Sequence, residues 1–413
     1  MSVRKRTWNG KNGQEREAWI VDYVDQAGDR HIKTFERKKE ADAYHATVNV
    51  EVASGTHTAP RKSLTLSEAG DLWIATCKAR GLERTTIDFY RQHLKLHICP
   101  YLGRRKLPEL TLPLIRQFED DLRSGKPPPG AVEGTARSAV MTKRVLTSLG
   151  SLLADAQERG ELAQNVVRSL RAGRGRGKDR RVERRLRKRL KVGVDIPTPD
   201  EIRRIVHALP GSRWRPLLLT AIFTGLRASE LRGLRWEDID LSKRELHVRQ
   251  RADRYKKIGQ PKSESGQRTV PLPPIVVEAL REWKLSYPRP ILAENQREPA
   301  KAQHLVFPTG TGQVEDHSNI LRRGLEPIQV AAGVTNGKTP PRARYTGLHA
   351  LRHFYASWCI NRKADGGLEL PPKLVQERLG HSSIVITLDL YGHLFARGDD
   401  GAELADAEHA LLG

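Results

Sequence analysis

The basic segment RAGRGRGKDRRVERRLRKRLKV, residues 171–192, is the feature that most limits how this chain can fold. Residues 171–194 hold 12 basic and 2 acidic side chains, so they carry +10 of the chain's formal charge of +23. Such a block repels itself unless phosphates neutralise it. We therefore expect a basic linker over residues 171–194, folded domains on both sides of it, and a nucleic acid as the partner.

The remaining composition fits an intracellular, modular protein. A chain of 413 residues is long enough for two or three domains, each with its own core. The widely spaced Cys77, Cys99 and Cys359 form neither a disulfide framework nor a zinc pattern, which suits a reducing compartment. The first residues, MSVRKRTWNGKNG, have no apolar signal core, and no apolar run is long enough to span a membrane.

Residues 1–60 predict a small module made of a sheet and one helix. The stretch AWIVDYVDQAGDRHIKTF, residues 18–35, has two β-type runs around a turn, and a helical pattern begins near Lys38. On composition alone, a structural cap and a ligand-binding module explain this region equally well.

Residues 61–170 predict a four-helix domain. Thr65 and Glu68 form a capping box at its start. Its basic residues could grip phosphates, although scattered surface charge explains any one of them. The four apolar stripes at helical spacing are Ala69, Leu72, Trp73 and Thr76; Ile87, Tyr90, Leu94 and Ile98; Leu114, Ile115, Phe118 and Leu122; and Val145, Leu149, Leu152 and Ala156.

Residues 195–413 predict a mainly helical domain with one small sheet. Thr198 is a good N-cap for a helix that has Pro199 at its first position. The nearly apolar run RPLLLTAIF, residues 215–223, should form a central helix, and ELHVR and RTVPLP should form strands. The expected fold class is thus mainly α and multidomain, with small β-sheets.

Two stretches of this domain could bind an anion. In LHALRHF, residues 348–354, His349 and Arg352 project from the same side of a helix. A zinc interpretation based on His349 and His353 is weaker, because no glutamate follows His349 and Arg352 would repel the cation. In TGLRASEL, a buried Arg227 would need a counter-charge, so Glu230 either only pairs with it or orients it towards a phosphate.

Three further stretches supply polar groups of uncertain role when each is taken alone. Lys262 precedes the strand RTVPL, with Lys256 and Lys257 close enough to compete for the same role. His381 lies in LGHSS, and Tyr391 lies in SSIVITLDLYGHLF, residues 382–395. A core aromatic is the ordinary interpretation of such a tyrosine, because Ile384, Ile386, Leu388, Leu390 and Leu394 would pack against its ring.

Taken together, TGLRASEL, PKSESGQRTVPL, LHALRHFYAS, LGHSS and TLDLYGHL closely resemble, in this order, the catalytic domain of the tyrosine site-specific recombinases, specifically the phage-type integrases. By the same resemblance, residues 61–170 are similar to the helical, SAM-like core-binding domain, and residues 1–60 to the module that binds arm-type sites.

Two features of the sequence depart from the commonest pattern of this family. The step from His381 to Tyr391 is one residue longer than in many relatives, and Gly266 stands where many carry serine.

The resemblance implies a role for each polar group and requires no cofactor or metal. Two arginines would bind the scissile phosphate, and attack by tyrosine would leave a 3′-phosphotyrosyl linkage that a 5′ hydroxyl can reverse. The implied set is Arg227 and Arg352 as phosphate ligands, Tyr391 as nucleophile, His349 as general base, His381 as a hydrogen-bond donor to the phosphate, and Lys262 as the general acid for the 5′ oxygen.

The resemblance also implies partners and a location. We expect double-stranded DNA with core-type and arm-type attachment sites, a homotetramer, and accessory DNA-bending or directionality proteins. The expected activity is integration and excision of a mobile element or prophage in the cytoplasm, at the nucleoid. In the tail, Leu404, Ala407 and Leu411 share a helical face that could dock on a neighbouring protomer or on its own domain.

Two alternative functions are those of a type IB topoisomerase, which acts alone on one duplex, and of an inactive DNA-binding regulator. The regulator predicts the loss of a catalytic residue, and none is missing.

Overall fold

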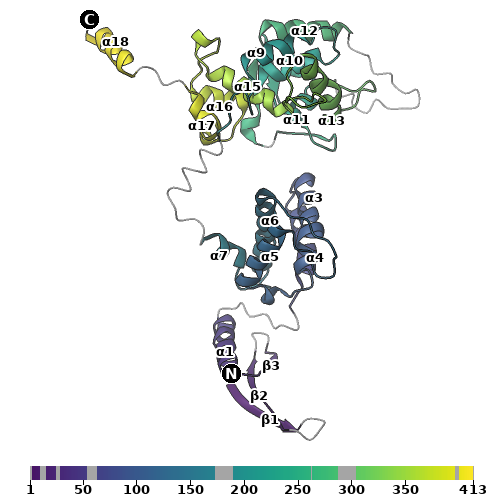
Figure 1. The fold of residues 1–413 in the computed structure, drawn as a ribbon, viewed down its shortest axis with the longest axis vertical. Coiled ribbons are helices and arrows are strands. Elements are labelled where there is room, and N and C mark those ends of the chain that lie inside the picture. The colour runs from purple at the N-terminus through teal and green to yellow at the C-terminus, as the bar shows by residue number, and fades with distance from the viewer. Residues whose placement is uncertain are drawn as a thin grey trace. The chain divides into compact units, whose positions relative to one another are not determined.

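The computed structural model describes residues 2–9, 15–24, 28–53, 63–172, 189–261, 263–286, 304–395 and 400–412. Contacts divide the chain into two compact units, one within residues 1–177 and one within residues 178–413 (Figure 1). Most of the expected basic linker and Lys262 lie outside the described residues. The domain boundaries expected at residues 60, 170 and 194 stay predictions.

The first unit begins with an antiparallel sheet and one helix. Its strands are β1 (Ser2–Asn9), β2 (Glu15–Val24) and β3 (Arg30–Phe35), in the order β1-β2-β3, and α1 (Lys38–Ala53) follows them. The predicted hairpin and helix are present, whereas β1 was not predicted because three of its eight residues are basic and its apolar residues do not alternate. The buried cluster of this region is Val21, Tyr23, Ala41 and Val48.

The four helices predicted for residues 61–170 are present, and one short helix is added. Thr65 and Glu68 form the predicted capping box, with Glu68 Oε2 accepting from Thr65 N at 2.8 Å. Buried apolar residues such as Trp73, Ile98 and Phe118 form the core of this region. The helices are α2 (Leu66–Ala79), α3 (Arg84–His93) continuing through a π-helical turn (Leu94–Ile98) into α4 (Cys99–Leu102), α5 (Leu112–Ser124), α6 (Ala139–Glu158) and the added α7 (Val166–Ala172).

The second unit is mainly helical. Thr198 caps its first described helix, with Pro199 at the first position, as predicted. The helices are α9 (Pro199–His207), α10 (Arg215–Thr224), α11 (Ala228–Gly233), α12 (Pro274–Ser286), α13 (His317–Asn319), α14 (Glu326–Ala331), α15 (Leu348–Ile360), α16 (Pro372–Leu379), α17 (Ile384–Tyr391) and α18 (Asp400–Leu412).

The prediction of one small sheet in this unit was incomplete. The structure has a three-stranded sheet of β4 (Ile239–Asp240), β5 (Glu245–Val248) and β8 (Arg268–Pro271), and a separate two-stranded ribbon of β6 (Arg251–Ala252) and β7 (Ile258–Gly259). The ribbon strands have two residues each, which is too short for any alternation to predict them.

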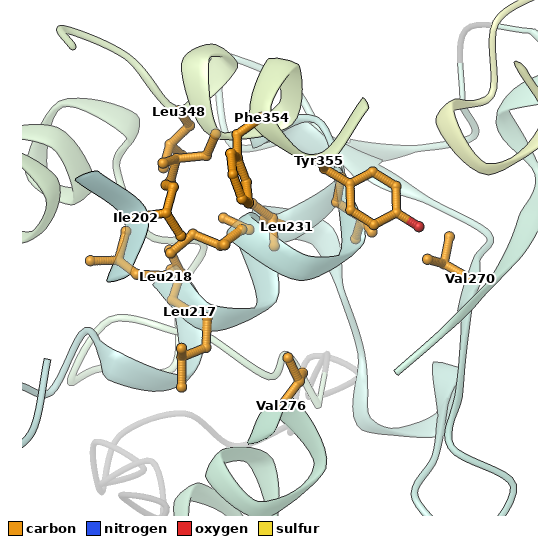
Figure 2. Packing of buried hydrophobic residues seen from close by; sticks show 14 of the residues in the cluster. Ile202, Leu217, Leu218, Leu231, Val270, Val276, Leu348, Phe354 and Tyr355 are labelled. Atoms are coloured by element: carbon orange, nitrogen blue, oxygen red, sulfur yellow. The ribbon is translucent and has the colours of Figure 1, made fainter. Parts of the chain in front are cut away.

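Helix α10 is central, as its apolar sequence predicts. Figure 2 shows Leu217 and Leu218 of α10 in the same buried cluster as Leu348 and Phe354 of α15. The helix ends at Gly225, whose φ of 61° is left-handed. A Cβ atom there would lie 2.3 Å from Cδ1 of Tyr355, so only glycine fits between the two helices.

The predicted fold class is confirmed: the chain is mainly helical, with small sheets in both units. No helix in the described part of the chain is long and apolar enough to cross a membrane.

Candidate active site

The C-terminal end of α16 holds three arginines. The backbone carbonyls of residues 378–380 accept hydrogen bonds from Arg268 Nε at 2.7 Å, Arg352 Nη2 at 2.6 Å and Arg227 Nη2 at 2.8 Å, in that order. The last carbonyls of a helix have no intrahelical partner and carry partial negative charge. The helix end therefore brings three cations together from three distant parts of the sequence.

Gly380 makes this arrangement possible. It caps α16 with a left-handed φ of 63°. A Cβ atom at this position would lie 2.9 Å from Arg268 Nη1 and 2.9 Å from the Ser265 carbonyl oxygen. The glycine of LGHSS thus serves both the turn and the close approach of Arg268.

Glu230 fixes the orientation of two of the arginines. Its side chain is 2% exposed and accepts from Arg227 Nη1 at 2.7 Å, from the Arg227 backbone N at 2.8 Å and, in bidentate fashion, from Arg268 at 2.9 and 3.1 Å. Burial alone would raise the pKa of Glu230, but the charges of Arg268 and Arg227 outweigh it and lower the pKa to about 2. Glu230 is therefore a carboxylate at neutral pH.

Arg227 is less buried than its sequence context suggested. Its side chain is 36% exposed, whereas Glu230 beside it is almost fully buried. The expectation of a buried Arg227 was wrong, because the turn after α10 carries the side chain to the rim of the core. Its pairing with Glu230 is confirmed, and the exposed part of its guanidinium remains accessible to an anion.

Arg352 is buried and surrounded by positive charge. Within the described part of the chain, its hydrogen bonds go to the carbonyls of Gly225, at 2.6 Å, and Leu379. Burial lowers the pKa of Arg352 to about 9, and the charges of Arg227 and Arg268 act in the same direction. The group stays charged at neutral pH, and an anion bound beside it would relieve the repulsion.

Three histidines near these arginines are neutral at neutral pH. Burial, followed by nearby positive charge, lowers the pKa of His381 to about 3 and also lowers the pKa of His349. Burial, then His349 and Arg352, lower the pKa of His353 to about 4. A neutral imidazole offers one donor and one acceptor nitrogen. In His381, Nδ1 lies 2.9 Å from Thr387 Oγ1.

Tyr391 lies at the end of α17, buried against these histidines. The residue is 1% exposed, and its hydroxyl oxygen lies 2.6 Å from His353 Nδ1. The His381 ring is parallel to the tyrosine ring at 6.5 Å between centroids. Burial raises the pKa of Tyr391 to about 12, against the opposing effect of Arg352. The phenol is therefore protonated at neutral pH, and it shares a hydrogen bond with His353 whose direction is set by the histidine tautomer.

The surroundings of Tyr391 differ in part from the prediction. Leu390 and Leu394 pack against the core as expected, but Ile386 and Leu388 are exposed. Tyr391 faces the core from a short helix whose other side is apolar and uncovered in the single chain. Its ring lies near the rings of His353 on α15 and His381 after α16.

Five of the six predicted site residues lie in this region: Arg227, His349, Arg352, His381 and Tyr391. The sixth, Lys262, lies outside the described residues. The competing Lys256 and Lys257 lie in the turn between β6 and β7, where both backbone amides donate to Asp253.

His353 lies closer to Tyr391 than its sequence pattern indicated. It was considered only as a metal ligand, yet its ring meets the His349 ring edge to face at 4.6 Å and its Nδ1 faces Tyr391. Its position four residues after His349, on the same helix face, is the signal that could have pointed to it. Among the described residues, no group of three or more His, Cys, Asp or Glu side chains could hold a metal ion.

Two family descriptions match the chain. "Phage integrase family" matches residues 197–397, and "Phage integrase, N-terminal SAM-like domain" matches residues 65–123. Together these ranges cover more than half of the sequence. They include every arginine, histidine and tyrosine of the site described above.

Curated relatives match over nearly the whole length. A "Tyrosine recombinase XerC-like" protein of Caldanaerobacter subterraneus subsp. tengcongensis is 27% identical over 419 residues, which covers 96% of both chains. An integrase of Streptomyces ambofaciens is 23% identical over 405 residues and covers 94% of both.

Solved structures share the fold at lower identity. The Tn1549 transposon integrase, in complex with transposon right end DNA, superposes with a TM-score of 0.60 at 17% identity, over 84% of this chain and 100% of that one. A lambda integrase tetramer bound to a Holliday junction gives a TM-score of 0.51 at 19% identity, over 91% and 95% of the two chains.

Proposed function

This chain belongs to the phage integrase family of tyrosine recombinases, which break and rejoin DNA, and we propose that it recombines two duplexes at specific sites through a 3′-phosphotyrosyl intermediate. The observation that carries the proposal is the position of the Tyr391 hydroxyl beside neutral histidines and the buried Arg352. We infer that the enzyme integrates and excises a mobile element.

The arginines account for binding of the scissile phosphate. Arg352 and the exposed part of Arg227 would each donate to non-bridging oxygens, while Glu230 and the α16 carbonyls keep both guanidinium groups in place. Attack creates a five-coordinate phosphorus with extra negative charge. Because the donors are already oriented, they bind that state more tightly than the ground state.

The chemical step exchanges one phosphodiester for another. The Tyr391 oxygen attacks phosphorus, the bond to the 5′ oxygen breaks, and Lys262 supplies the proton that the leaving oxygen needs. His381 donates from Nε2 to the phosphate, since Thr387 occupies its Nδ1. His349 has the general-base position by resemblance to the family. A 5′ hydroxyl of the other duplex reverses the step and joins the exchanged strands.

We propose double-stranded DNA as the partner, with core-type sites bound by residues 61–170 and 195–413 and arm-type sites by residues 1–60. Exposed basic residues such as Arg104, Lys143 and Arg144 suit contacts with phosphates. The lambda integrase neighbour is a tetramer on a Holliday junction, and we propose a homotetramer here too, helped by accessory DNA-bending or directionality proteins. We propose that the enzyme acts in the cytoplasm, at the nucleoid, where its DNA substrate lies.

A nicked DNA substrate that traps the covalent intermediate tests the proposal. The wild-type protein should form a covalent adduct with a core-site duplex, whereas Tyr391→Phe should bind the duplex equally tightly and form none. An adduct that persists in Tyr391→Phe would refute the proposed nucleophile. Relaxation of a plasmid that lacks any recognition site would favour a type IB topoisomerase instead.

A further inference from the structure

The Tyr391 hydroxyl has one hydrogen-bond partner within the described part of the chain, and it is His353. The oxygen lies 2.6 Å from His353 Nδ1, a short distance for a neutral pair. His349, one helical turn earlier, makes no hydrogen bond to the hydroxyl in this structure. The histidine that contacts the reacting oxygen is thus His353, which has no part in the mechanism proposed so far.

Both partners of this hydrogen bond are neutral at working pH. His353 is neutral at working pH because burial, His349 and Arg352 all lower its pKa, to about 4. Tyr391 keeps its proton because burial raises its pKa to about 12. In the Nε2–H tautomer of His353, which the inference assigns, the phenol donates and the lone pair of Nδ1 accepts.

The packing excludes other acceptors. Tyr391 is 1% exposed, so water has almost no access to its hydroxyl. The His381 ring lies parallel to the tyrosine ring and its Nδ1 is engaged by Thr387, so it does not compete. His349 contacts the His353 ring edge to face, at 80° between ring planes, which holds His353 in its orientation.

We propose that His353 holds the Tyr391 hydroxyl and accepts its proton as the oxygen attacks the scissile phosphate. The inference rests on the proposed function. In the step, an O–P bond forms from Tyr391 and the P–O5′ bond breaks. The phenolic proton moves to His353 Nδ1, and the leaving 5′ oxygen takes a proton from the general acid, the position of Lys262. The rejoining step returns both protons.

This assignment gives the two histidines of α15, His349 and His353, different roles. The imidazolium formed on His353 would face Arg352, and the negative charge of the five-coordinate phosphorus would offset that repulsion. His349, which keeps part of its side chain exposed, is then available to the phosphate and not required by the phenol.

The test is the single-turnover rate of adduct formation on the nicked substrate, over about pH 5 to 9. His353→Ala should slow the rate by roughly 100- to 10,000-fold, the usual contribution of a positioned proton acceptor. His353→Asn keeps an acceptor near the place of Nδ1 but cannot take a proton. It should therefore recover only a small part of the rate that His353→Ala loses. A fluorinated tyrosine at position 391, with a more acidic phenol, should recover much of the rate lost in His353→Ala.

The matched control is His247→Ala. His247 also lies close to a hydroxyl through Nδ1, 2.9 Å from Thr269 Oγ1, but it is on β5, outside the site. It should keep the wild-type rate and pH profile. Melting temperatures and DNA affinities of all variants establish that each is folded and binds.

The outcomes distinguish this inference from the proposed function. If His353→Ala keeps the wild-type rate and pH profile while Tyr391→Phe forms no adduct, the role of His353 is wrong and the proposed function stands. A slow His353→Ala that the fluorinated tyrosine does not rescue also overturns proton acceptance. If Tyr391→Phe itself forms the adduct, the proposed function fails first.

Discussion

Glu230 shows how one carboxylate can organise a binding site for anions. It accepts hydrogen bonds from Arg227 and Arg268 and has almost no exposure to water. The Glu230→Gln substitution keeps the shape but leaves both guanidinium groups without a counter-ion. Removing one partner of a buried pair costs about 3–5 kcal/mol. We expect a loss of that size in the free energy of urea unfolding, together with slower adduct formation.

The control for Glu230→Gln is Glu282→Gln. Glu282 also pairs with an arginine, Arg215, but its side chain is 67% exposed. Exposed pairs contribute about 0–1 kcal/mol, so this variant should unfold almost as the wild type does. Equal stabilities of the two variants would mean that Glu230 does not support the arginines.

Lys262 is tested by changing the leaving group. Lys262→Ala should cleave normal DNA slowly, because the 5′ oxygen leaves without a proton. A substrate with sulfur in place of that oxygen needs no proton for departure, so its cleavage rate should return close to that of the wild type. Lys256→Ala, in the nearby turn, should behave as the wild type does on both substrates. Failure of sulfur to rescue Lys262→Ala would remove Lys262 from the acid role.

At the scale of single residues, the sequence predicted local contacts and did not predict contacts between distant residues. The pairing of Arg227 with Glu230 follows from a three-residue spacing at the start of a helix, which is a local relation. The contact of His353 with Tyr391 joins residues 38 positions apart and depends on how α15 and α17 pack. No local pattern encodes that packing.

The ends of two helices, α16 and α10, position the arginines of the site. The carbonyl end of α16 binds three arginines, and the end of α10 at Gly225 supplies the carbonyl that binds Arg352. Because Gly225 is left-handed and touches Tyr355, Gly225→Ala should both strain the backbone and displace the ring. We expect a loss of about 2–4 kcal/mol in the free energy of unfolding and a drop in cleavage.

Gly211→Ala separates these two effects. Gly211 is also left-handed, at φ 78°, but a Cβ atom there would have no neighbour within 4 Å. Gly211→Ala should lower the free energy of unfolding only through backbone strain, by about 1 kcal/mol. If Gly225→Ala were no more destabilising than Gly211→Ala, the close packing of α10 against α15 would not matter for the site.

Helices with a regular apolar stripe were predicted well, and short polar elements were not. The capping box at Thr65, the N-cap at Thr198 and the apolar run of α10 are strong local signals. Strand β1 and the β6–β7 ribbon lack such signals. The ribbon depends on Asp253, whose carboxylate accepts from the amides of Tyr255 and Lys257 and so closes the turn.

On the scale of the whole molecule, the charge of residues 171–194 predicts how DNA binding responds to salt. If these residues bind phosphates, replacing several arginines between 171 and 192 by glutamine should flatten the plot of log affinity against log salt. The slope should change by about 0.9 for each phosphate that the protein no longer neutralises. Replacing the same arginines by lysine keeps the charge and should keep the slope. An unchanged slope in the glutamine variant would make the segment a solvated linker only.

The most direct measurement is the identification of the residue that becomes attached to DNA. The wild-type adduct on a nicked core-site substrate would be digested with protease and nuclease, and the nucleotide-bearing peptide sequenced by mass spectrometry. We predict one modified peptide, with the nucleotide on Tyr391 and joined through its 3′ phosphate. Attachment at another residue, attachment through a 5′ phosphate, or a failure to form any adduct with a cognate site would contradict the mechanism.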